Sequence, residues 1–243
     1  MAPTDGGGRF RLRLWPTLIA APALAVLIGL GTWQVERLHW KEDLNATLAA
    51  RLAAPAVVPE ALPADPAAAE FRKVRLEGRF RHDRELYLGP RTLRGEVGVH
   101  VVTPFQRTAG GTVLVDRGFV PAARKDPATR AEGQVAGVVT MEGVLRLPGR
   151  RGPFTPDDDP RANQWFVVDP PAMAAAAGIG GVAPWYVDAG PAPNPGGLPV
   201  GGQTVVMLPN NHLQYAVTWY GLAAALAVIY VLSSRRPATP AKP

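Results

Sequence analysis

Two long segments without a charged side chain, one near each end, constrain this 243-residue chain more than any other feature. No Lys, Arg, Asp or Glu occurs in residues 14–35, and none occurs in residues 189–234. A helix rises about 1.5 Å per residue, so roughly 20 apolar residues cross the ~30 Å hydrocarbon core of a membrane. The sequence therefore predicts transmembrane helices over residues 14–35 and 212–232.

The charges outside these segments predict an orientation. The N-terminal tail, residues 1–13, carries three arginines and one aspartate, and the C-terminal tail, residues 233–243, carries two arginines and one lysine. Basic and acidic residues nearly cancel between the spans, so almost all of the formal charge of +6 lies on the tails. By the positive-inside rule both termini face the cytoplasm and the region between the spans projects to the opposite side.

The composition favours a bacterial origin. The chain is rich in Ala, Pro, Gly and Arg, and its first residues lack the Arg/Ser-rich amphipathic pattern of a mitochondrial presequence. A cleaved signal peptide is the alternative for the first segment, but the apolar run continues past the small-residue triplet Ala21-Pro22-Ala23. We therefore expect a protein of the bacterial inner (plasma) membrane with its main domain in the periplasm.

The region between the spans divides by composition. Residues 36–70 predict an exit helix followed by a proline-rich linker, in which four prolines disfavour regular helix. Residues 71–211 predict an extracytoplasmic, β-rich domain. Its clearest strand is FRKVRLEGRFR, in which apolar and charged residues alternate with the period of a half-buried strand.

Seven further stretches show strand-like patterns: Glu85–Leu88, Val97–Phe105, Thr112–Val120, Val138–Leu147, Gln164–Asp169, Trp185–Asp188 and Thr204–Leu208. One helix is predicted over Pro170–Ala177, with Asp169 as its N-cap and Gly178 at its end. The predicted fold is thus a membrane protein in which two transmembrane helices flank a mainly antiparallel β (α+β) domain, either a small barrel or a sandwich.

The block Asn210-Asn211-His212-Leu213-Gln214-Tyr215 enters the second apolar segment and holds the main candidate for function. Polar groups at the mouth of a membrane helix need partners. His212, Tyr215 and Trp219 have the i, i+3, i+7 spacing of one helix face, which suits an axial haem ligand walled by aromatic rings. The alternative is an interfacial histidine within an ordinary aromatic belt.

A second polar group lies at the end of the first apolar segment, on the same predicted side of the membrane. It comprises Trp33, Gln34, Arg37 and Trp40. An arginine here suits a haem propionate, because its planar guanidinium matches a carboxylate. An interfacial anchor with a snorkelling arginine is the alternative for this group.

The remaining candidates favour structural roles. His39, just beyond the first span, is a possible second ligand, and with His82 and His100 it is otherwise expected to be mostly exposed. In the strand TVLVDRGFVP, Arg117 shares a face with valines and needs a carboxylate or several carbonyls, so we expect a structural pair near Gly118, with partner binding as the lesser option. The acidic run at residues 157–159 lacks the glycine and distal glutamate of a calcium loop and predicts a solvated turn.

The sequence gives little support for catalysis. Cysteine is absent, which excludes a disulfide framework, a thiolate metal site and a thiol nucleophile. No G-x-S-x-G, H-E-x-x-H or phosphate-binding glycine loop occurs. No basic patch with interleaved aromatics indicates nucleic-acid binding. We therefore do not expect an enzyme.

Taken in order, six segments resemble the surfeit locus protein 1 family, the cytochrome c oxidase assembly factors of proteobacteria and mitochondria: LGTWQVERLHWK, LVDRGFVP, EGVLRLP, PDDDPRANQWFVVD, PVGGQT and NHLQYAVTWYGLA. The resemblance covers nearly the whole chain. It implies a protein that helps to deliver haem a, bound transiently, to the catalytic subunit of the oxidase, with haem a synthase and membrane lipid as further partners.

The family pattern also implies which residues contact the cofactor. Its haem-related histidine corresponds to His212, the expected metal ligand. The matching cofactor residues are Trp33, Gln34 and Arg37 in the first block, and Tyr215, Trp219 and Tyr220 in the second. Two hypotheses follow: a membrane-anchored haem a chaperone, or an assembly scaffold that binds the oxidase subunit without a cofactor. An extracytoplasmic sensor or enzyme ranks below both.

Overall fold

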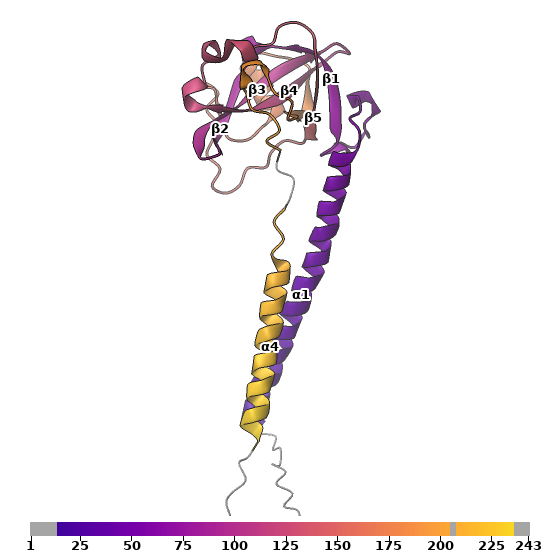
Figure 1. Cartoon of the computed structure of the whole chain (residues 1–243), viewed down its shortest axis with the longest axis vertical. Helices are drawn as coiled ribbons and strands as arrows, with labels where there is room; N and C mark the ends of the chain where they lie inside the picture. The colour runs from indigo at the N-terminus through magenta and orange to yellow at the C-terminus, as the bar shows by residue number, and fades with distance from the viewer. Residues whose placement is uncertain (1–13, 205–207, 236–243) are drawn as a thin grey trace, which may run out of the picture. The chain divides into compact units, whose positions relative to one another are not determined.

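The computed structural model describes residues 14–204 and 208–235, which form two compact units. The first unit is helical and combines residues 14–47 with residues 208–235. The second unit, residues 48–204, contains the β-sheet. Figure 1 shows the helices and strands of both units along the chain.

Two helices long and apolar enough to cross a membrane make up most of the helical unit: α1, Leu14–Ala53, and α4, His212–Ser234. Only 6% and 11% of the residues in their most apolar windows are buried within the protein, so these surfaces need lipid or another apolar partner. The two helices lie side by side (Figure 1), joined by hydrogen bonds between their side chains. The first helix continues without a break from the predicted span into the predicted exit helix.

The linker contains more helix than its prolines suggested. After the 3₁₀ turn Pro59–Ala61 comes the one-turn helix α2, Pro66–Ala69. It forms because Pro66 occupies the first turn, where its missing N–H costs no hydrogen bond, and because Asp65 caps the N-terminus by accepting from the Ala67 amide at 3.0 Å.

The second unit contains a seven-stranded sheet in the order β1-β5-β7-β4-β3-β2-β6. The strands are β1 Lys73–Phe80, β2 Leu86–Leu93, β3 Glu96–Arg107, β4 Thr112–Pro121, β5 Val139–Arg146, β6 Gln164–Trp165 and β7 Val182–Ala189. An additional antiparallel pairing of β1 with β3 closes β1, β5, β7, β4 and β3 into a barrel. Beyond the ring, β2 and β6 extend the sheet.

Most neighbouring strands run antiparallel, as predicted, but β4 pairs with β7 in parallel and β2 pairs with β6 in parallel. The parallel register places Asp116 of β4 beside Asp188 of β7. On β1 the predicted alternation is confirmed, since Val74 and Leu76 are buried and Arg75 is exposed.

Two apolar clusters form the core. One lies among the ring strands and includes Leu76, Phe105, Val115 and Val187. The other joins β2 and β4 to helix α3, Pro170–Ala177, which has the predicted bounds. Its Asp169 N-cap accepts from the Ala172 amide at 3.1 Å, and Gly178 ends it in the left-handed conformation at φ 67°. Further 3₁₀ turns span His82–Arg84, Ala122–Arg124, Pro127–Gly133 and Pro195–Gly197.

One strand prediction differs from the structure, and another lies largely outside the described residues. The strand expected over Gln164–Asp169 stops after two residues, because the Phe166 amide donates to the Asp158 carboxylate instead of to a neighbouring strand. The strand expected over Thr204–Leu208 falls largely on residues 205–207, which lie outside the described residues, and its two described ends are not in a strand.

Candidate cofactor site on the helix pair

His212 is the first residue of α4, and its half-buried imidazole faces α1. Its Nδ1 lies 2.6 Å from Oε1 of Gln34, in a hydrogen bond between the two helices. A carbonyl oxygen only accepts, so Nδ1 carries the proton and donates it. The other ring nitrogen, Nε2, therefore keeps its lone pair, which is the arrangement found in metal-binding histidines.

Gln34 is the residue of the first polar group that reaches His212. Its side chain is only 9% exposed, which is unusual for an amide on a long apolar helix. A buried amide without partners is costly, so the bond to His212 stabilises the contact between the helices. The two polar groups that the sequence placed at one membrane surface thus meet through this pair.

Asparagines continue the contact beyond the apolar spans. Asn45 of α1 donates to the Leu208 carbonyl at 3.2 Å and accepts from the Leu208 amide at 3.3 Å. Asn210 donates to the Leu38 carbonyl at 3.4 Å. These bonds fix the chain that leads into α4, and so they help to position His212.

The sequence reasoning missed Asn45 as part of this contact, although a signal was present. Gln34, Leu38 and Asn45 are four and seven residues apart, which places them on one face of α1. Uncharged amide side chains at both ends of such a face indicate a partner segment that can hydrogen-bond to them.

Arg37 lies against two tryptophans of its own helix. Its guanidinium carbon lies 4.5 Å from the ring centroid of Trp40 and 6.0 Å from that of Trp33. Both tryptophans are about half exposed. The three side chains form a cation–π stack along α1, on a face next to the one that carries Gln34. This stack offers a flat aromatic and cationic surface beside the histidine.

The aromatic residues of α4 divide into two groups. Tyr220 faces α1, where its hydroxyl lies 3.1 Å from Thr32 Oγ1 and its ring packs against Gly31. Tyr215 is 54% exposed, and Trp219 is partly buried. Together with His212, these two keep the predicted one-face spacing within α4.

The site offers one imidazole nitrogen rather than a complete set of ligands. Among the described residues, no group of three or more His, Cys, Asp or Glu is arranged to hold a metal ion. A single imidazole suits a metal whose other ligands arrive with it, as the iron of a porphyrin does. His39, the possible second ligand, is exposed on α1.

The other two histidines are not mostly exposed, contrary to expectation. His82 Nε2 donates to the Val135 carbonyl at 3.0 Å, and His100 Nδ1 lies 2.8 Å from the Asp116 carboxylate. Each side chain is less than one-fifth exposed. The imidazoles were misjudged because their partners are distant in sequence, so no local pattern shows them.

The acidic run at residues 157–159 is only partly the solvated turn that the sequence predicted. Asp157 is fully exposed. Asp158 is mostly buried and pairs with Arg151, and Asp159 accepts from the amides that follow it. These two carboxylates hold the loop in place.

Arg117 occupies the structural position expected for it. Its side chain is 1% exposed, and it donates to the Gly133 carbonyl at 2.6 Å and to Asn194 Oδ1 at 3.2 Å. The carboxylate of Glu85, 2% exposed, lies 3.6 Å away. Burial lowers the pKa of Arg117, but a guanidinium remains protonated at neutral pH.

Glu85 is paired more closely with a second arginine. Arg130 donates to both of its oxygens, at 3.2 and 2.5 Å, and Gln134 donates at 3.1 Å. Burial acts to raise the pKa of Glu85, but hydrogen bonds from His82 and Arg130 outweigh it and lower the pKa to about 2. The barrel therefore contains a buried ionic network with two guanidinium groups and one carboxylate.

Comparison with known proteins agrees with the two-helix architecture and with the sequence blocks around it. The model of the SURF1 family matches residues 21–224. Surfeit locus protein 1 of Mus musculus is 43% identical over 231 residues, covering 88% of this chain and 73% of the mouse protein. The Homo sapiens protein of the same name is 43% identical over 232 residues, covering 88% and 75%. A SURF1-like protein of Monosiga brevicollis is 40% identical over 248 residues, covering 97% and 91%. A match of this extent shows that the chain belongs to the SURF1 family.

Proposed function

We propose that this chain is an assembly factor for a haem–copper cytochrome c oxidase, the role implied by its family. We further propose that it binds haem a on the α1–α4 helix pair and helps to insert it into the catalytic subunit. The observation that carries this proposal is the 2.6 Å hydrogen bond between His212 and Gln34, which leaves Nε2 of His212 free to ligate iron.

The residues present fit such a group. The imidazole is half-buried at the start of α4, so an iron ligand there is shielded without being enclosed. Arg37 carries a positive charge beside two tryptophan rings, which suits a propionate and the face of a macrocycle. The exposed apolar surfaces of α1 and α4 suit the long apolar tail of haem a.

A haem carrier must also release the haem that it binds. One histidine ligand binds haem less firmly than two, and a partner that supplies its own ligands then competes effectively. We propose a non-catalytic role in which haem a synthase supplies the haem, the oxidase subunit accepts it, and membrane lipid surrounds the helices. The charged tails support a topology with both termini cytoplasmic and the main domain periplasmic, and the composition favours a bacterial inner membrane.

A scaffold without a cofactor is the second candidate, and one observation favours it. The bond between Gln34 and His212, like the stack of Arg37 on its tryptophans, already satisfies these side chains without a ligand. In that case His212 serves only to join the helices.

The experiment that separates the two is the absorption spectrum of the protein purified from membranes that synthesise haem a. We expect a Soret band, identified as haem a by pyridine haemochrome, that His212→Ala removes. His39→Ala is the matched control, since that exposed histidine lies on the same helix pair, and it should keep the band. A colourless wild type from haem a-replete membranes contradicts the chaperone and supports the scaffold.

A further inference from the structure

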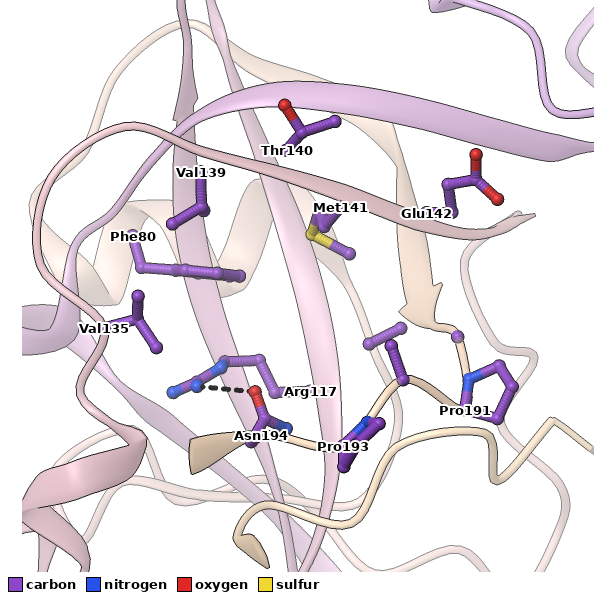
Figure 2. Close-up of a pocket in the computed structure, with 13 residues that line it drawn as sticks. Phe80, Arg117, Val135, Val139, Thr140, Met141, Glu142, Pro191, Pro193 and Asn194 are labelled. Carbon is purple, nitrogen blue, oxygen red and sulfur yellow. Dashed lines mark hydrogen bonds between the residues drawn. The ribbon is translucent and has the colours of Figure 1, made fainter. Parts of the chain in front are cut away.

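A groove opens at the end of the barrel where β1 and β7 finish and β5 begins (Figure 2). Its volume is about 610 Å³, within the range of small-molecule sites, which often lie at the mouths of β-barrels. The walls are mainly apolar and include Phe80, Val139, Met141 and the prolines 191 and 193. At its base lie the guanidinium of Arg117 and the amide of Asn194, which face each other in Figure 2.

The base of the groove carries unbalanced positive charge. The one carboxylate close to Arg117 is that of Glu85, and it is engaged by Arg130 at 2.5 Å while it lies 3.6 Å from Arg117. Arg117 Nη2 donates to two neutral groups, the Gly133 carbonyl and the side-chain amide oxygen of Asn194. His82 Nδ1 lies 3.4 Å from Arg117 Nη1 and 3.6 Å from the Glu85 carboxylate. An imidazole carries no negative charge in either tautomer, so His82 does not balance the charge of Arg117.

Arg117 shares its one close carboxylate with a second buried guanidinium, so its charge is only partly balanced, and an anion that reaches it gains more than it does in water. The ring of Phe80 lies over the guanidinium, with its centroid 4.7 Å from the central carbon, so one face of the charge is already shielded. The fork of Arg117 matches a carboxylate, and most of the surrounding wall is apolar. The carboxylate of Glu142, which also lines the groove, is paired with Arg75.

We infer that this groove binds a small amphiphilic carboxylate, whose carboxylate pairs with Arg117 and whose apolar chain lies against Phe80, Val139 and Met141. The carboxylate replaces the amide oxygen of Asn194, a neutral acceptor on the loop after β7. Met141 is unbranched and adapts to chains of different shape. The site belongs to the barrel unit and does not depend on haem binding.

The test uses the full-length protein in lipid nanodiscs, with empty nanodiscs as the blank. Octanoate, labelled with ¹³C at its carboxyl carbon, is titrated and followed by NMR, and octan-1-ol and octylammonium are titrated for comparison. We expect saturable binding of octanoate that is about tenfold tighter than that of octanol, and no saturable binding of octylammonium. Equal affinity for octanoate and octanol, or no saturable binding of octanoate, overturns the inference.

Two variants locate the site. Arg117→Gln should abolish the preference for octanoate over octanol, while Val139→Trp should fill the groove and remove binding of both. Arg79→Gln, which removes the same charge from an exposed position on β1, is the matched control and should bind as the wild type does. Arg117→Gln disturbs a buried network and could prevent folding. In that case the binding measured with Val139→Trp tests the location of the site on its own. Unchanged octanoate binding in a folded Val139→Trp protein contradicts this location.

Discussion

Buried polar side chains occur in both units of the chain, but the two units stabilise them differently. In the barrel, the carboxylate of Glu85 is shared among several donors within a water-excluding core. In the helical unit, single hydrogen bonds join α1 to α4, such as Gln34 to His212 and Thr32 to Tyr220. Around those bonds most of the helix surface is exposed and apolar.

This difference predicts that substitutions in the two units have different consequences. Removing one member of the ionic network leaves other charges buried without a partner, so the barrel should respond with a large loss of stability. The bonds of the helix pair are individually weak, because bonds between membrane helices contribute roughly 0.6 kcal/mol on average. If the proposed haem a binding holds, changes there should therefore affect haem retention more than the folding of the protein.

The largest effect is expected for Glu85→Gln. It leaves the guanidinium groups of Arg117 and Arg130 buried without a carboxylate, at a cost of about 3–5 kcal/mol in the free energy of unfolding. Urea unfolding followed by near-UV circular dichroism measures it. Glu142→Gln is the matched control, since its pair with Arg75 is exposed, and it should cost below about 1 kcal/mol. Similar losses in the two variants would contradict a special role for the buried network.

The next effect is a pH dependence centred on Asp188. Burial, and then repulsion from Asp116, raises the pKa of Asp188 to about 6, against the ordinary 3.8. The folded state therefore binds a proton more tightly than the unfolded chain, so this group stabilises the barrel as pH falls from above 6 towards 4, by up to about 3 kcal/mol.

Unfolding measured across that pH range in wild type and Asp188→Asn tests this expectation. Asparagine does not titrate, so the variant should lose this rise in stability. Glu85 contributes with the opposite sign, because its pKa is lowered to about 2 and its contribution is lost only as pH falls below 4.5. A wild-type profile that declines steadily from pH 7 to 4 would show that the Asp188 contribution is absent.

A third prediction concerns the orientation of His212. Gln34→Leu removes the acceptor for Nδ1–H, and loss of such a partner typically weakens metal binding by about 10–100-fold. If the proposed haem a binding holds, haem transfer to excess apomyoglobin should quicken by a comparable factor, with the unfolding of the barrel unchanged. Gln34→Glu keeps an acceptor and should retain haem. Equal haem retention in the wild type, Gln34→Leu and Gln34→Glu would mean that Gln34 only joins the two helices.

A fourth prediction uses two glycines on α1. A Cβ at Gly31 would lie 2.7 Å from the ring of Tyr220, whereas a Cβ at Gly29 would meet nothing within 4 Å. Gly29→Ala should gain helix propensity, and Gly31→Ala should lose that gain to overpacking, for a difference of about 1 kcal/mol. Unfolding of the helix pair in mixed micelles of increasing SDS content measures both. Identical midpoints would mean that the helices do not pack closely there.

The smallest effect is expected for Tyr220→Phe. It removes the hydroxyl that bonds to Thr32, so the same SDS titration should show a loss of about 0.6 kcal/mol. Tyr215→Phe serves as the control, because no hydrogen bond of its hydroxyl is found among the described residues and the ring is largely exposed. A larger loss for Tyr215→Phe than for Tyr220→Phe would contradict the hydrogen bond assigned to the Tyr220 hydroxyl.

Local signals in the sequence predicted much of this fold. The helix Pro170–Ala177 has its cap, its proline turn and its terminal glycine in the sequence itself, and its bounds are confirmed. The alternation on β1 is equally local. Closure of the barrel is not local, because it joins Phe80 to Phe105 and places Asp116 beside Asp188 across long intervals of chain. Nothing in the sequence pattern states which strands pair.

The candidate site shows the same limit. Topology predicted that the two polar groups meet, but the sequence did not show whether Gln34 or Arg37 reaches His212. In the structure Gln34 does, while Arg37 stacks on two tryptophans of its own helix. Both residues are polar and lie three positions apart. Only the rotation of α1 about its axis distinguishes them, and that rotation is set by packing against α4.

The closed ring of strands has a consequence for recognition. A sheet with a free edge can receive a strand from another chain, which leads to specific pairing or to aggregation. Among the described strands, the ring leaves no free edge, and the outer side of β2 is covered at Tyr87 and Leu88 by β6 and lacks an amide donor at Pro90. A strand from another chain could therefore extend this sheet only along the two residues of β6 or the far end of β2. Elsewhere on the ring a docking protein is recognised through side chains and loops.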